Sequence, residues 1–153
     1  MRKILWPAIM LSVLVGFVPG RAVQAANKPC AGAPQYRVAQ GAHASGSQKM
    51  TLYLQISVAP DAISKDSLLQ LACRLRMDFA REQRLKVWIF TDSQAAKRFN
   101  FDQHSPTYHE DLAKLRGSYW LDREKGEQSI RFSSDPQKPE DMQQIDLPAP
   151  ASN

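Results

Sequence analysis

The chain has 153 residues, of which 20 are lysine or arginine, 15 are aspartate or glutamate and 8% are aromatic, so it holds at most one modest soluble domain. Its formal charge of +5 depends on a leader with Arg2, Lys3 and Arg21 and no acid; removing these three from the 20 leaves 17 basic against 15 acidic residues. This near balance argues against a dedicated nucleic-acid binder, which would concentrate basic side chains on one face.

The N-terminal segment has the layout of a secretory signal peptide. Arg2 and Lys3 precede an almost entirely apolar run, 4–18, and a small-residue cleavage site follows at Ala25. An uncleaved membrane anchor is the alternative interpretation, but the run is shorter than the roughly 20 apolar residues of a spanning helix. We therefore expect residues 1–25 to be removed.

The predicted signal peptide determines where we expect the mature protein to be located. The protein is predicted to be periplasmic or secreted, with no integral membrane span after cleavage of the signal peptide. The short basic start and the absence of any Asn-x-Ser/Thr acceptor fit a bacterial source.

The two cysteines, Cys30 and Cys73, both follow the predicted cleavage point. An oxidising compartment makes a disulfide between them the expected state, with intermolecular pairing or two free thiols as alternatives. The bond would join the N-terminal arm to the first helix and stabilise the fold by roughly 3 to 4 kcal/mol. A redox-catalytic role is disfavoured because the chain has no Cys-x-x-Cys pair.

The remaining chain divides by composition into three parts. Residues 26–48 are rich in Ala, Gly, Ser, Gln and Pro, which predicts a flexible linker with at most a short edge strand around 36–38. Residues 49–134 form the single folded domain. Residues 135–153 contain four prolines and few large apolar residues, which predicts a disordered tail.

The first half of the domain predicts a strand, a helix and a second strand. Apolar and polar residues alternate over 50–58, as in a strand with one buried face. Ser64 is a suitable N-cap for an amphipathic helix that carries apolar residues at helical spacing through Phe79. The next strand, 85–90, is apolar on both sides and is therefore expected to be central.

The second half predicts short helices and a hairpin. Helices are expected over 94–99 and 108–115, and strands around 119–121 and 129–133 form a hairpin whose loop closes on Gly126. The sum is a small α+β two-layer domain, in which strand, helix and strand are followed by a short helix and a C-terminal β-hairpin.

Two groups of residues can carry a function. The first combines residue types that bind zinc or related ions within nine positions: Asp102, His104, His109 and Glu110. Their spacing matches no recognised metal site, and a solvated surface loop is the favoured interpretation. The second is a set of aromatic and basic residues that can bind sugar, peptide or single-stranded nucleic acid if exposed: Trp88, Tyr119, Trp120, Arg123 and Arg131. Burial in the small core is its competing interpretation.

No catalytic residue or cofactor is indicated, because the chain has neither a Gly-x-Ser-x-Gly elbow nor a glycine-rich phosphate loop. The leading functional hypothesis is a non-catalytic binding module for an unknown protein or envelope ligand, with no nucleic acid as partner. The alternative is a small metal-dependent hydrolase in which His104 and His109 hold a metal that activates water.

Overall fold

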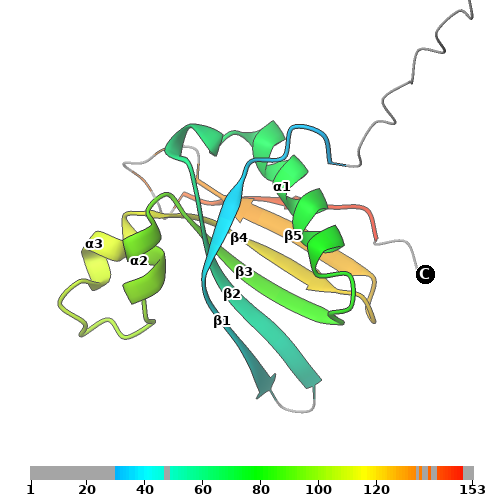
Figure 1. Ribbon diagram of the computed structural model, residues 1–153, viewed down its shortest axis with the longest axis horizontal. Helices are drawn as coiled ribbons and strands as arrows, with labels where there is room; N and C mark the ends of the chain where they lie inside the picture. The colour runs from blue at the N-terminus through cyan, green and yellow to red at the C-terminus, as the bar shows by residue number, and fades with distance from the viewer. Residues whose placement is uncertain (1–29, 47–48, 134, 136–137, 139–140, 150–153) are drawn as a thin grey trace, which may run out of the picture.

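The computed structural model describes residues 30–46, 49–133, 135, 138 and 141–149. The predicted signal peptide, 1–25, lies outside these residues. The described chain forms a six-stranded mixed sheet with three α-helices, in which the strands lie side by side in chain order from β1 to β6 (Figure 1). This architecture confirms the predicted α+β class.

The centre of the sheet is built from β2 (Lys49–Val58), α1 (Lys65–Asp78) and β3 (Arg84–Phe90). β2 and β3 pair in parallel, and α1 connects them across one face of the sheet. The side chain of Ser64 caps α1 by accepting a hydrogen bond from the backbone N–H of Ser67 at 3.2 Å. A 3₁₀ turn, Pro60–Ala62, precedes the helix.

The second half of the sheet is antiparallel. β4 (Leu115–Asp122) pairs with β3, and β5 (Glu127–Phe132) pairs with β4 through a tight turn in which Gly126 has φ +68°. The α1 side of β2 to β5 packs against the buried face of α1 to form the main hydrophobic core: Leu52, Leu54, Ile56, Val58, Leu68, Leu71, Ala72, Leu75, Leu85, Val87, Ile89, Tyr119, Leu121, Ile130 and Phe132.

Two short helices, α2 (Ser93–Arg98) and α3 (Tyr108–Leu112), pack at one end of the sheet (Figure 1). Phe90 and Leu115 contact them, whereas Val87 and Ile89 belong to the α1 core. Because neighbouring residues of a strand point to opposite faces, α2 and α3 cover the face opposite α1. They cover only one end of it, and no helix of the described ranges lies over the rest of this second face, here called the open face.

The structure corrects the predicted linker. Residues Tyr36–Gly46 form β1, an 11-residue edge strand that pairs antiparallel with β2. Its side chains are mostly exposed, which explains why composition alone suggested a linker. The strand is stabilised by the backbone ladder that β2 offers, and few large apolar residues are needed for that.

The predicted tail is corrected in the same way. Gln143–Asp146 forms β6, which pairs with β5, and the half-buried Ile145 packs against the main core. The helix predicted over 108–115 ends at Leu112, because Leu115 already belongs to β4. β4 also begins earlier than the strand predicted around 119–121.

The predicted disulfide is present between Cys30 and Cys73, with the two Cα atoms 5.5 Å apart. It holds the start of the described chain against α1. Close by, the Tyr36 hydroxyl donates to Asp78 Oδ2 at 2.7 Å, which ties the beginning of β1 to the last turn of the same helix. No helix within the described ranges is long and apolar enough to cross a membrane.

Candidate functional site

The open face carries two rows of side chains that run across all six strands. Strand register places six residues in the first row: Ala42, Tyr53, Lys86, Trp120, Ser129 and Asp146. The second row lies beside it: Gln40, Gln55, Trp88, Ser118, Arg131 and Gln144. Neighbouring strands are about 4.8 Å apart, so each row is roughly 24 Å long.

An aromatic groove occupies the β1 to β3 end of these rows. The ring of Tyr53 stacks on that of Trp88 with centroids 5.8 Å apart, and Phe101 from the loop after α2 contacts Trp88 at 4.7 Å. Small residues of β1 leave space beside these rings, and the groove has a volume of about 630 Å³. That volume is in the range of small-molecule binding sites. Phe101 is 56% exposed, so its ring is accessible to a ligand in the groove.

Gln55 lies beneath the aromatic groove and is 9% exposed. Its side-chain amide donates to the backbone carbonyl of Phe99 at 3.1 Å. None of the described residues donates a hydrogen bond to the buried Oε1 of Gln55. An acceptor left without a donor costs about 1 to 3 kcal/mol, and a hydroxyl or N–H group that entered the groove would lower this cost.

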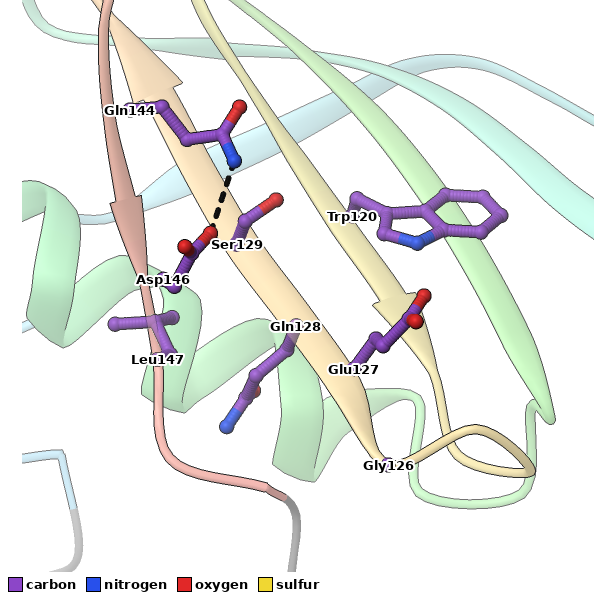
Figure 2. Close-up of a pocket in the computed structure, with 8 residues that line it drawn as sticks. All are labelled: Trp120, Gly126, Glu127, Gln128, Ser129, Gln144, Asp146 and Leu147. Atoms are coloured by element: carbon purple, nitrogen blue, oxygen red, sulfur yellow. Dashed lines mark hydrogen bonds between the residues drawn. The ribbon is translucent and has the colours of Figure 1, made fainter.

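A second, polar hollow lies at the β4 to β6 end of the rows, with a volume of about 450 Å³ (Figure 2). Trp120 and Leu147 are its large apolar lining residues, and most of its other side chains are polar or charged: Glu127, Gln128, Ser129, Gln144 and Asp146. The Gln144 amide donates to Asp146 Oδ1 at 2.9 Å, as Figure 2 shows. This hydrogen bond orients two planar polar groups at the rim of the hollow.

Lys86 lies between the groove and the hollow. Its Nζ is 5.9 Å from the ring centroid of Trp88 and also 5.9 Å from that of Trp120. Both distances are within the range of cation–π attraction. The two cavities are therefore joined by a lysine that contacts a tryptophan on each side.

The predicted binding-face residues divide between the two faces of the sheet. Trp88, Trp120 and Arg131 lie on the open face. Tyr119 does not, because it precedes Trp120 in β4 and its side chain points to the opposite face. Arg123 does not either: its guanidinium donates to the backbone carbonyls of Glu82 and Arg76 at 3.0 and 2.9 Å.

Tyr119 is a core residue. Its side chain is fully buried beneath α1, and its hydroxyl donates to Gln128 Oε1 at 3.0 Å. Burial raises the pKa of Tyr119 to about 12 despite the positive charges of Arg76 and Arg123. The hydroxyl is therefore neutral at physiological pH.

The four residues of the predicted metal site are not brought together. The side chain of His104 is 96% exposed, and its Nδ1 lies 3.1 Å from Asp102 Oδ1 in a local turn. Glu110 instead faces Arg98, with 3.6 Å between Oε1 and Nη2, and the ring of His109 packs edge-on against Tyr108. Within the part of the chain that the structure describes, no three His, Cys, Asp or Glu side chains gather as metal ligands.

Sequence reasoning did not single out Asp111, the buried carboxylate of this region. Arg98 Nη2 donates to Asp111 Oδ1 at 2.7 Å and so joins α2 to α3. Burial alone would raise the pKa of Asp111, but hydrogen bonds from Arg98 and Thr107 and the charge of Arg98 outweigh it and hold the pKa below its ordinary value of 3.8. The pair fixes the two helices at the end of the open face.

Acid should weaken this attachment. Because the folded pKa of Asp111 is depressed, its contribution to stability is present above pH 3.8 and is lost as pH falls through the lower, folded value. We expect Asp111→Asn to be less stable than the native chain at neutral pH and to lose less stability on acidification. Urea unfolding at a series of pH values measures both, with Asp61→Asn, an exposed carboxylate of the 3₁₀ turn, as the control. Equal acid slopes for native and Asp111→Asn protein would contradict the assignment.

Among the described residues, the open face thus combines two cavities, the half-buried rings of Tyr53, Trp88 and Trp120, the exposed ring of Phe101 and a buried acceptor, Gln55 Oε1, to which no described residue donates. Comparison of the chain with protein-family models, curated proteins and solved structures finds no match.

Proposed function

We propose that the protein is a non-catalytic binding module that holds its ligand on the open face, in the aromatic groove. The observation that carries this proposal is the contact of three accessible aromatic rings, Tyr53, Trp88 and Phe101, beside a cavity of about 630 Å³. A core this small needs most of its large apolar side chains for stability. Aromatic rings left at the surface in mutual contact are instead typical of recognition sites.

The groove is held in shape before any ligand arrives. The side-chain amide of Gln40 in β1 donates to the backbone carbonyl of Lys97, and that of Gln55 in β2 donates to Phe99. These two bonds attach the end of α2 and the loop bearing Phe101 to the sheet. A groove with fixed walls binds with a smaller loss of conformational entropy than a flexible one.

Two features support a module that acts outside the cytoplasm, in the periplasm or as a secreted protein. The disulfide between Cys30 and Cys73 is a bond that persists in oxidising compartments. The signal-peptide pattern of residues 1–25 has the same implication. The competing metal-dependent hydrolase has less support, since Asp102, His104, His109 and Glu110 do not form a ligand set.

The aromatic groove should take up small ring compounds. We expect indole, phenol and cyclohexanol to shift the amide resonances of Tyr53, Trp88 and Phe101 in NMR titrations of the full chain. Phe101→Ser should weaken this binding by about tenfold, which corresponds to roughly 1.4 kcal/mol. Because Phe101 is 56% exposed, the substitution should leave the fold intact.

Met50→Ser is the matched control, since Met50 is 58% exposed and lies outside the groove. The dissociation constants of indole, phenol and cyclohexanol for Met50→Ser should stay within a factor of about two of those for the native protein. Probes that bind nowhere, or that bind equally well to native protein and Phe101→Ser, would overturn the proposed function.

A further inference from the structure

The two cavities of the open face lie on one line. The first row runs from the aromatic groove at Tyr53, past Lys86, to Trp120 and Asp146 in the polar hollow. A ligand that used both cavities would cross the strands at a right angle and extend over roughly 20 Å. An extended polymer fits such a track better than a compact small molecule does.

The ring faces along this track suit a sugar. Trp88 and Tyr53 stack at an interplanar angle of 16°, and Trp120 presents a further half-buried ring two strands away from Tyr53. The apolar C–H face of a pyranose packs on such rings as other apolar groups do. In a β-1,4-linked chain, successive pyranoses form a flat ribbon with a repeat close to the strand spacing.

The polar groups beside the rings can form hydrogen bonds with the hydroxyl groups of a sugar. Asp146, Gln144 and Glu127 present carboxylate and amide oxygens at the polar hollow. Beneath the aromatic groove, Gln55 Oε1 is an acceptor to which no residue of the described ranges donates. Acceptors of this kind bind the hydroxyl or acetamido N–H groups of a sugar. Charge is balanced over the rows and the polar hollow together: Lys86 and Arg131 stand in the rows, against Asp146 in the first row and Glu127 at the hollow. This balance favours a neutral ligand over a polyanion.

A peptide suits this face less well. Extended peptides gain affinity by adding backbone hydrogen bonds to a sheet edge. On the open face the backbone groups of β2 to β5 are already used in the ladder on both sides of each strand. Only side chains are available to a ligand there.

We infer that the ligand is a neutral β-linked polysaccharide whose chain lies across the strands from the aromatic groove to the polar hollow. This inference rests on the proposed function, because it names the ligand class of the same face. It assigns Trp120 as a stacking platform, the stacked Tyr53 and Trp88 rings as the apolar wall of the aromatic groove, and Asp146 as a hydroxyl acceptor.

Tryptophan fluorescence tests the inference directly. The chain has three tryptophans, and Trp6 lies in the predicted signal peptide, so Trp6→Phe leaves only Trp88 and Trp120, both on the open face. Adding Trp88→Phe or Trp120→Phe then gives proteins with one reporter each. We expect the hexamer of β-1,4-linked N-acetylglucosamine to change the emission of both single reporters over the same concentration range. The dimer, which is too short to span the row, should bind at least about tenfold more weakly.

Single substitutions test whether Trp120 and Asp146 bind the sugar chain. Trp120→Ala should weaken hexamer binding by at least about tenfold, the size of effect found when a central aromatic anchor is truncated. Asp146→Asn should weaken it severalfold, whereas Asp61→Asn, which changes an exposed carboxylate on another part of the surface, should not. Unchanged affinity in Trp120→Ala would overturn the placement of the chain across both cavities.

The failure of this inference is distinguishable from failure of the proposed function. If hexamers of N-acetylglucosamine and of glucose leave both reporters unchanged at millimolar concentration while indole still occupies the groove, the polysaccharide inference is wrong and the binding module stands. A proline-rich decapeptide that changed both reporters in place of the sugars would also overturn it. If neither sugars nor indole bind, both proposals are wrong.

Discussion

Replacing both Cys30 and Cys73 with serine is expected to lower the free energy of unfolding by about 4 kcal/mol. The bond joins residues 43 positions apart, and a loop of that length restricts the unfolded chain strongly. A domain of this size is only marginally stable, so such a loss unfolds a large fraction of the molecules. Denaturant unfolding of the oxidised native chain and of the double serine variant measures the difference.

Reduced native protein is the control for the disulfide. It should unfold at the same denaturant concentration as the double serine variant, because both lack the cross-link and keep every other side chain. The Tyr36–Asp78 hydrogen bond and the long β1–β2 ladder hold the start of the chain in both. A loss below about 1 kcal/mol would mean that these contacts, rather than the bond, order the N-terminal arm.

The central elements were predictable because their signals are local. The alternation over 50–58 and the Ser64 cap each depend on neighbouring residues, and the structure places β2 and α1 there. β1 and β6 lack that signal. They are stabilised by backbone hydrogen bonds from β2 and β5, partners that no local pattern of 36–46 or 143–146 reveals.

The candidate site was predictable only in part for the same reason. Trp88 and Trp120 were identified by residue type, and the register of β3 and β4 brings them to one face. Tyr53 lies on the polar side of an alternating strand, and this position in the sequence already indicates that its ring is on the face opposite the main core. Phe101 comes from a loop, and its contact with Trp88 depends on tertiary packing of α2.

The four residues considered as a metal site show the opposite case, in which neighbours in sequence are separated in space. Asp102, His104, His109 and Glu110 are close in sequence, but the chain turns between them. Glu110 faces Arg98, while the adjacent Asp111 points into the protein. Of the four side chains, only Asp102 and His104 therefore meet, with Oδ1 and Nδ1 3.1 Å apart.

A second large effect is expected at Gly117 in β4. A Cβ atom there would lie 2.4 Å from the carbonyl oxygen of Arg131 and 3.3 Å from Phe132 Cα in the paired strand β5. These are backbone atoms that cannot rotate away, so Gly117→Ala must separate β4 from β5. We expect the free energy of unfolding to fall by about 2 to 3 kcal/mol, as for other overpacked sites.

Gly41→Ala in β1 is the matched control, since both glycines lie in strands. The nearest atom to a Cβ at Gly41 is the Leu54 Cδ2 at 2.8 Å, the end of a side chain that can change rotamer. Its cost should stay below about 1 kcal/mol, because alanine also loses less conformational entropy than glycine on folding. Equal unfolding midpoints for the two variants in denaturant would contradict the close approach at Gly117.

The Gly117→Ala substitution should also affect ligand binding on the open face. Ser118 and Arg131 pair directly beside Gly117 and belong to the second row, and Trp120 and Ser129 follow in the first. Separating β4 from β5 moves Trp120 relative to the polar hollow on β5 and β6. A Gly117→Ala protein that remains folded should therefore lose more affinity for the N-acetylglucosamine hexamer than for indole. Indole binds in the aromatic groove, which is built on β1 to β3 and not on β4 and β5.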